Sequence, residues 1–321
     1  MSKKSLKMNN NKLGAAHTPT ECVHTETKHA SKYIRPREPE LMVMTDRDKG
    51  ILTRVWEDRM LFTSQISRIF FSGKSRANVR LRKLWEHSYL DRYFLPTLMF
   101  HGSTEALYLL GSRGVDVAAA KIGVERTEIA RGMSHLKRKV RTHSFLLSLD
   151  HILSLADFRI AFESAMANRP DLRLEVWVPE RMCEDSYQVW RGGGRITGKL
   201  RPDGYCRCRK DGRILSFFIE VDLGTMSNKA FRDKVQRYLD YSDSGRYQQI
   251  SGVKYFRVLV ATVGEQRLSN LKGVTEELTD SVFWFTTLEQ IRRGLIFDQI
   301  WQRAGQDGLY PLFEGSEGLL S

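Results

Sequence analysis

Three carboxylates lie in two adjoining segments with strand-like sequences: Asp203, Glu220 and Asp222. The dipeptide Asp211-Gly212 between the segments is typical of a two-residue hairpin, because a type I′ turn needs positive φ at both positions. Counting outward from this turn places Asp203 opposite Glu220. Side chains alternate along a strand, so Asp222 is expected on the same face as Glu220.

Like charges that face each other on a sheet are destabilising unless a proton is shared or a cation lies among them. Hard oxygen ligands at this spacing suit Mg²⁺ or Mn²⁺. The sequence therefore predicts a divalent-metal site formed by Asp203, Glu220 and Asp222. The same register sends Cys206 and Cys208 to the opposite face, where we expect core packing rather than a metal or redox role.

The elements that would position these carboxylates follow from the hydrophobic pattern. It predicts a helix, three strands, a helix and a further strand, which is a mixed α/β core. The expected ranges are 146–166 and 229–241 for the helices, and 172–178, 199–209, 214–223 and 255–263 for the strands.

A second group of functional candidates lies in the basic segment 75–83, where the predicted DNA-binding residues are Arg76, Arg80, Arg82 and Lys83. A short helix, a turn with Gly73 and this basic helix predict a helix-turn-helix. Two extended runs around His101-Gly102-Ser103 predict a wing. The expectation is a winged helix that binds duplex DNA, and the alternative is a small helical bundle with a basic surface helix.

The composition agrees with a nucleic-acid partner. Of the 321 residues, 51 are basic and 38 acidic, and the net charge of +13 favours a polyanion. The chain shows no signal peptide or membrane span, and its four cysteines suit a reduced compartment, so we expect a cytoplasmic protein. The predicted division is a disordered basic tail (1–40), a winged-helix domain (41–112), a helical connector (113–141) and a nuclease-like domain (142–321).

Two resemblances support this organisation. Pro202-Asp203 and Glu220-Val221-Asp222 resemble the PD-(D/E)xK signature of restriction-endonuclease-like folds, which implies that fold for the second domain. The chain departs from the signature at Asp222, which stands where the signature has lysine. Some members of that superfamily supply the lysine from the following helix. Lys234 is the natural substitute here, and it shares a helix face with Tyr238 and Tyr241.

The second resemblance covers most of the chain after the tail. The segments 45–48 and 80–84, together with Arg201-Pro202-Asp203-Gly204 and 218–225, are similar to the replication-relaxation family, which includes MobC-type relaxases of mobilizable plasmids. This resemblance implies a protein that binds double-stranded DNA at an origin of transfer and nicks one strand. A relaxosome accessory protein or a coupling protein is a further candidate partner.

The leading hypothesis is therefore a metal-dependent relaxase with Asp203, Glu220, Asp222 and Lys234 as catalytic residues. Its nucleophile is either a metal-activated water or a tyrosine, with Tyr187, Tyr238 and Tyr241 as candidates. One alternative is a non-catalytic regulator of replication or transcription whose nuclease fold only adds DNA contacts. Another is a restriction or repair nuclease, which would break both strands or act on damaged DNA.

Overall fold

The computed structural model describes residues 33–95, 105–141, 146–191 and 193–313. The backbone divides into two compact units, residues 1–37 and 38–321, and every element below belongs to the second. Most of the predicted tail, up to residue 32, lies outside the described residues. So does the tripeptide His101-Gly102-Ser103 of the predicted wing.

The N-terminal part of this unit has the element order expected of a winged helix. A capping box begins the first helix: the Thr45 hydroxyl accepts from the Asp48 amide, and the Asp48 carboxylate accepts from the Thr45 amide. The three strands form one sheet in the order β1-β3-β2. The elements are α1 (Asp46–Glu57), β1 (Leu61–Phe62), α2 (Thr63–Phe70), α3 (Lys74–Glu86), β2 (Leu90–Phe94) and β3 (Ala106–Leu110).

The segment predicted as a helical connector is helical, with α4 (Ser112–Ile122) and α5 (Arg126–Arg141). Both helices pack into the same core as α1, α3 and β3, through residues such as Val115 and Met133. The first half of α6 (Leu146–Met166) adds Leu149 and Ile152 to that core, whereas its second half adds Phe158 and Phe162 to the next one.

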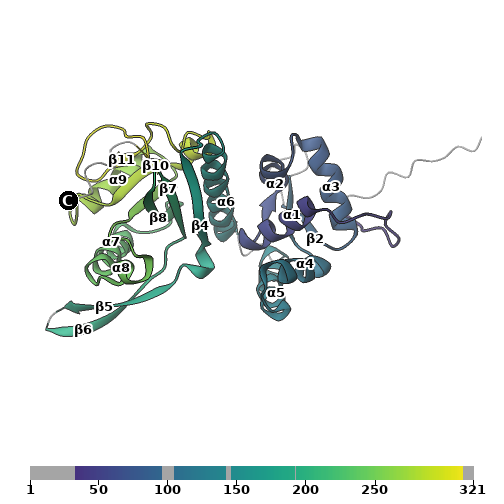
Figure 1. The fold of residues 1–321 in the computed structure, drawn as a ribbon, viewed down its shortest axis with the longest axis horizontal. Coiled ribbons are helices and arrows are strands. Elements are labelled where there is room, and N and C mark those ends of the chain that lie inside the picture. The colour runs from purple at the N-terminus through teal and green to yellow at the C-terminus, as the bar shows by residue number, and fades with distance from the viewer. Residues whose placement is uncertain (1–32, 96–104, 142–145, 192, 314–321) are drawn as a thin grey trace, which may run out of the picture. The chain divides into compact units, whose positions relative to one another are not determined.

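The C-terminal part contains the predicted order of helix, three strands, helix and strand, so the mixed α/β fold class is confirmed. Its sheet has six strands in the order β11-β10-β9-β8-β7-β4 (Figure 1). The predicted elements are observed as α6, β4 (Leu172–Pro179), β7 (Gly204–Lys210), β8 (Arg213–Asp222), α7 (Asn228–Asp243) and β9 (Arg257–Thr262). Further elements are α8 (Arg246–Ser251), α9 (Glu265–Glu276), β10 (Phe283–Thr287), α10 (Leu288–Arg292) and β11 (Gln302–Arg303).

The predicted hairpin register is confirmed. Asp211 and Gly212 have φ values of 48° and 80°, and Gly204 pairs with Ile219. Odd-numbered residues of β8 pack with Cys206 and Cys208 in the core under α6 and α10. Even-numbered residues face the core formed with α7 and α9. The two cysteines are therefore core residues, as expected.

The prediction of one strand over 199–209 is wrong. A strand β6 (Gly194–Leu200) ends before Arg201-Pro202-Asp203, and β7 begins only at Gly204. Pro202 has no amide hydrogen for a ladder bond, which favours a break at this point. Strand β6 pairs instead with β5 (Asp185–Arg191), and the two form a separate two-stranded sheet.

Candidate active site

The candidate site lies where the chain enters β7 and leaves β8. Asp203 precedes β7, and its amide donates to the Ile219 carbonyl at 3.1 Å. Its Oδ2 accepts from the Val221 amide at 2.8 Å. The backbone contact with Ile219 and the side-chain contact with Val221 hold Asp203 beside Glu220 of β8.

Lys234 of α7 joins these two carboxylates. Its Nζ forms an ion pair with Glu220 and lies 3.9 Å from Oδ1 of Asp203. The Tyr238 hydroxyl, one helical turn further along, donates to Oε1 of Glu220 at 2.5 Å. Glu220 is only 3% exposed, so both of its oxygens are satisfied inside the protein. We call Asp203, Glu220 and Lys234 the carboxylate–lysine cluster.

His151 is a neighbour of this cluster that the sequence did not predict. Nε2 of His151 lies 3.2 Å from Oδ2 of Asp203. Burial opposes protonation of the imidazole, but the Asp203 carboxylate outweighs it and raises the pKa of His151. His151 belongs to α6, far from the other residues in sequence, and its spacing carries no signal for this contact.

The two carboxyl groups of the cluster have very different pKa values. Burial acts to raise the pKa of Asp203, but the charges of Lys234 and His151 lower it to about 2. Glu220 is different, because burial raises its pKa to about 8, the Asp203 charge adds to that effect, and Lys234 only partly offsets it. Asp203 is thus the permanent anion at neutral pH, and Glu220 is the group that titrates near neutrality.

Asp222 does not join the cluster. Both of its oxygens bind Arg267 of α9, at 2.8 and 3.0 Å, and its Oδ2 also accepts from the Thr262 hydroxyl at 2.9 Å. Asp222 does lie on the α7 and α9 side of the sheet, as the alternation predicts. Within the described ranges, no three His, Cys, Asp or Glu side chains are grouped so that they could hold a metal ion. The structure therefore does not group the expected trio of ligands: Arg267 pairs with Asp222, and Lys234 lies between Asp203 and Glu220.

The remaining pair fits a divalent cation by its chemistry. Asp203 and Glu220 supply hard oxygen atoms and already share one cation, the Lys234 ammonium. Asp203, His151 and Lys234 also line a cavity of about 430 Å³.

The three tyrosines proposed as nucleophiles are buried. Tyr238 is 1% exposed and donates to Glu220, and Tyr241 is also 1% exposed and donates to Asp185 at 2.9 Å. Tyr187 is 4% exposed and packs against Tyr241. Burial raises the pKa of Tyr238 and Tyr241 above the usual range. None of the three hydroxyls is placed to attack a phosphate at the cavity.

The predicted DNA-binding residues of α3 have different surroundings. Arg80 donates to both oxygens of buried Asp48 and to the Val43 carbonyl. The structure gives Arg80 a bracing role that the sequence did not predict. The other three contact nearby side chains: Arg76 with Ser72, Arg82 with Glu86 and Lys83 with Glu40.

The exposed part of α3 is its first two turns, which contain Arg76 and also Lys74, Ser75 and Asn78. Lys74, Ser75 and Asn78 were not among the DNA-binding residues predicted from the basic segment 75–83. Val79, an apolar residue in the same part of α3, is 63% exposed. Recognition helices contact base edges mainly through their N-terminal residues, so this end is the stronger candidate for DNA binding.

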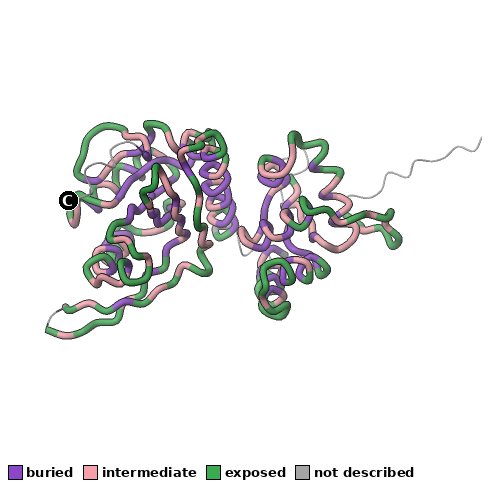
Figure 2. Tube along the Cα trace, in the orientation of Figure 1, coloured by how far each residue is buried: buried purple, intermediate pink, exposed green. Residues whose placement is uncertain are grey.

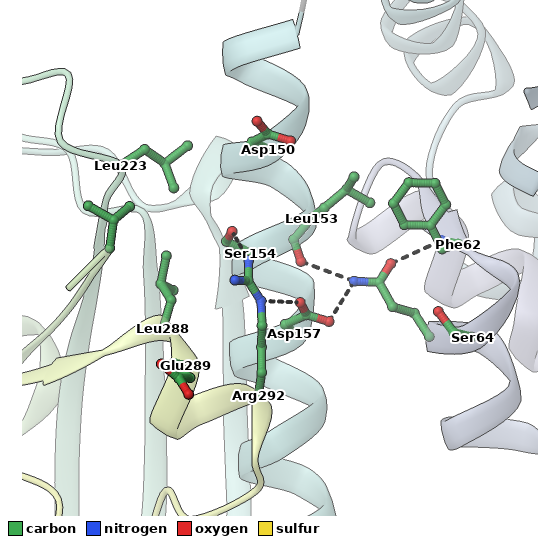
Figure 3. Close-up of a pocket in the computed structure, with 12 residues that line it drawn as sticks. Phe62, Ser64, Asp150, Leu153, Ser154, Asp157, Leu223, Leu288, Glu289 and Arg292 are labelled. Atoms are coloured by element: carbon green, nitrogen blue, oxygen red, sulfur yellow. Dashed lines mark hydrogen bonds and ion pairs between the residues drawn. The ribbon is translucent and has the colours of Figure 1, made fainter. Parts of the chain in front are cut away.

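A second cavity, of about 680 Å³, is lined by parts of α2, α6 and α10 (Figure 3). Several of its polar groups bind one another. The Gln65 side-chain amide donates to the Leu153 carbonyl at 3.0 Å and to Asp157 at 2.9 Å. Asp157 is also paired with Arg292 at 3.2 Å. These contacts indicate a structural role for this region.

A family model described as Replication-relaxation matches residues 52–255. The chain belongs to the replication-relaxation family. The matched range contains α3 as well as Asp203, Glu220 and Lys234, so the resemblance noted from the sequence is confirmed at the level of the family. No curated relative matches the chain.

Two solved structures are similar to this member of the family. One is restriction endonuclease FokI, at 12% identity over 79% of this chain and 45% of that one, with a TM-score of 0.29. The other is FokI bound to DNA, at 11% identity over 79% and 46%, with a TM-score of 0.26. The chain spans less than half the length of either. Among the described residues, no helix has the length and apolar character needed to cross a membrane.

Proposed function

We propose that this member of the replication-relaxation family is a DNA-nicking endonuclease of the MobC relaxase type, which acts at an origin of transfer with Mg²⁺ or Mn²⁺. The observation that carries the proposal is the position of Lys234. Its ammonium lies against both Asp203 and Glu220 beside an open cavity. The chain thus combines two carboxylates with a lysine from the following helix, although Asp222 occupies the motif's lysine position.

In this proposal Asp203 and Glu220 hold the cation, and Lys234 turns toward the substrate. A bound divalent ion would polarise the phosphoryl oxygen and stabilise the leaving oxygen. Lys234 would neutralise the charge that develops on the phosphate. His151 holds the Asp203 carboxylate in place through its contact at 3.2 Å. Burial of Tyr187, Tyr238 and Tyr241 favours water as the nucleophile.

Duplex DNA is the proposed partner of α3. Lys74, Ser75, Arg76 and Asn78 are exposed on its first two turns and combine phosphate-binding with base-reading side chains. Arg82 and Lys83 lie further along the helix, where they would contact the phosphate backbone. A relaxosome accessory protein or a coupling protein remains a further proposed partner.

One observation favours the non-catalytic regulator. Both oxygens of Glu220 are engaged by Lys234 and Tyr238, so a metal ion must displace the lysine before it can bind Glu220 fully. A regulator that uses this fold only for DNA contacts would leave the cluster closed. A restriction or repair nuclease would share the cluster but yield a different product.

The test is incubation of supercoiled plasmid, with and without the transfer origin, with purified protein and Mn²⁺ or Mg²⁺. The proposal expects open-circular product only with the origin and the metal, and a loss of roughly 100-fold or more for Asp203→Asn. The matched control is Asp233→Asn, an exposed carboxylate next to Lys234 on α7, which should nick like wild type. Linear product would indicate a restriction-type nuclease, and no product with any form would support the regulator.

A further inference from the structure

The strands β5 and β6 form a two-stranded ribbon that extends away from the six-stranded sheet (Figure 1). Its seven residue pairs run from Asp185↔Leu200 to Arg191↔Gly194. Because the two strands are antiparallel, paired residues lie on the same face, and alternate pairs lie on opposite faces. The ribbon therefore has two faces of different composition.

The inner face attaches the ribbon to α7 and α8. Tyr187 and Leu200 are buried in the core that contains Tyr241. The Asp185 carboxylate at the base of the ribbon accepts from the Tyr241 hydroxyl at 2.9 Å and pairs with Arg246 at 3.1 Å. Gly198 lies under the Tyr187 ring, where an added Cβ would approach the ring to 2.4 Å. These contacts fix the direction in which the ribbon leaves the core.

The outer face is exposed, as the colouring along β5 and β6 illustrates (Figure 2). Trp190 is 73% exposed, although burying such a ring would be strongly favourable. This outer face has no acidic residue, and every other side chain on it can donate a hydrogen bond. Its members are Ser186, Gln188, Trp190, Arg195, Thr197 and Lys199.

The charge on this face is concentrated near the tip. Lys199, near the base, is paired with Glu184 at 2.8 Å. Arg195 is exposed, lies opposite Trp190, and has no ion pair within the described part of the chain. The tip thus presents a cation and an aromatic ring side by side.

We propose that the outer face of this ribbon binds duplex DNA in the major groove, next to the scissile phosphate. A two-stranded ribbon has the width that the major groove admits. Gln and Arg are side chains that form bidentate contacts with adenine and guanine edges, and an apolar surface contacts the thymine methyl group. This composition fits a duplex better than an apolar protein partner.

The position of the ribbon in the chain connects it to the candidate active site. Strand β6 ends at Leu200, and Arg201 and Pro202 then lead directly to Asp203. DNA held by the ribbon would therefore be held by an element that leads directly in sequence to a residue of the carboxylate–lysine cluster. The inference rests on the proposed function for its DNA substrate, and it adds a second reading surface besides α3.

Duplex binding by the full chain tests the proposal, measured by fluorescence anisotropy in EDTA with a duplex of about 30 base pairs, or three helical turns. Trp190→Ala and Arg195→Ala should each weaken binding by roughly 10-fold. Arg195→Ala should also relax the preference for guanine at the position that Arg195 contacts. Both residues are exposed, so the melting temperature should not change. The matched control is Arg213→Ala, an exposed arginine on the neighbouring hairpin.

Dimethyl sulfate, which methylates guanine N7 in the major groove, provides the groove-specific measurement. Wild type should protect guanines that Arg195→Ala leaves reactive. Unchanged duplex affinity in both variants would overturn the proposal. So would weaker binding to single strands alone, which would indicate that Trp190 stacks on unpaired bases. This assay needs no metal, so its outcome is independent of nicking. A protein that does not nick plasmid can still bind duplex through the ribbon, and a protein that nicks normally can still show no binding by the ribbon.

Discussion

The contact between Arg80 and Asp48 gives the sharpest test of how α3 is used. Asp48 is fully buried and accepts from both the amide and the hydroxyl of Thr45, as well as from Arg80. Burial opposes the charged form, but the Arg80 and Thr45 hydrogen bonds lower the pKa of Asp48. Arg80→Ala would leave this carboxylate charged, buried and without its cation.

The magnitude follows from these contacts. Removing one partner of a buried ion pair costs about 3–5 kcal/mol. The Arg80 side chain is 24% exposed, so water can replace part of its contribution, and Thr45 still donates two hydrogen bonds. We therefore expect Arg80→Ala to lower the free energy of unfolding by about 2–3 kcal/mol. Exposed Arg76→Ala should change it by less than about 0.5 kcal/mol but weaken DNA binding.

Urea denaturation of both variants, together with a double-mutant cycle of Arg80→Ala and Asp48→Asn, measures these values. The cycle should give a coupling energy of about 2 kcal/mol, because each substitution removes the same ion pair. The bracing role is refuted if Arg80→Ala is as stable as wild type and loses sequence-specific DNA binding. That outcome would restore Arg80 to the DNA-reading role that the sequence predicted.

Three further predictions concern the C-terminal part. The raised pKa of Glu220 means that its neutral form stabilises the fold fully below about pH 4.5, and that this stabilisation is lost as pH rises through about 8. Melting temperatures in EDTA should therefore fall over this range for wild type but not for Glu220→Gln. Asp222→Asn should lose about 2 kcal/mol of stability in urea, because Arg267 loses its buried partner; an unchanged value would return Asp222 to the list of candidate metal ligands. Tyr238→Phe should keep nicking activity and move its optimum to higher pH, because the Tyr238 hydrogen bond lowers the pKa of Glu220 and its loss should raise that pKa; complete loss of nicking with an intact fold would contradict this prediction.

Local signals in the sequence predicted much of this fold. Asp211-Gly212 indicated the register between β7 and β8, because a two-residue hairpin turn needs positive φ at both positions and few residue pairs tolerate that. Asp203 and Glu220 followed from that register. Lys234 required the resemblance as well, because helical spacing alone does not show which surface a helix face contacts.

The missed features depend on contacts between distant segments. His151 reaches Asp203 from α6, and Arg267 reaches Asp222 from α9. Alternation predicted that Asp203, Glu220 and Asp222 form one group. Lys234 and Arg267 divide this group, and sequence spacing alone does not indicate which carboxylate each cation contacts. The ribbon was missed because residues 199–209 alternate through the break at Pro202. Arg80 shares a helix face with Arg76, yet tertiary contact with Asp48 gives it another role.

In the proposed function, Lys234 completes a metal-dependent cutting site with Asp203 and Glu220. The most direct test of this role is the rate of nicking of supercoiled origin plasmid in Mn²⁺ by wild type, Lys234→Met and Lys229→Met. Lys229 is an exposed lysine on the same helix and serves as the matched control. We expect that Lys234→Met is folded, binds the duplex normally and nicks roughly 100-fold more slowly or not at all, while Lys229→Met keeps the wild-type rate. Nicking by Lys234→Met at the wild-type rate would contradict this expectation.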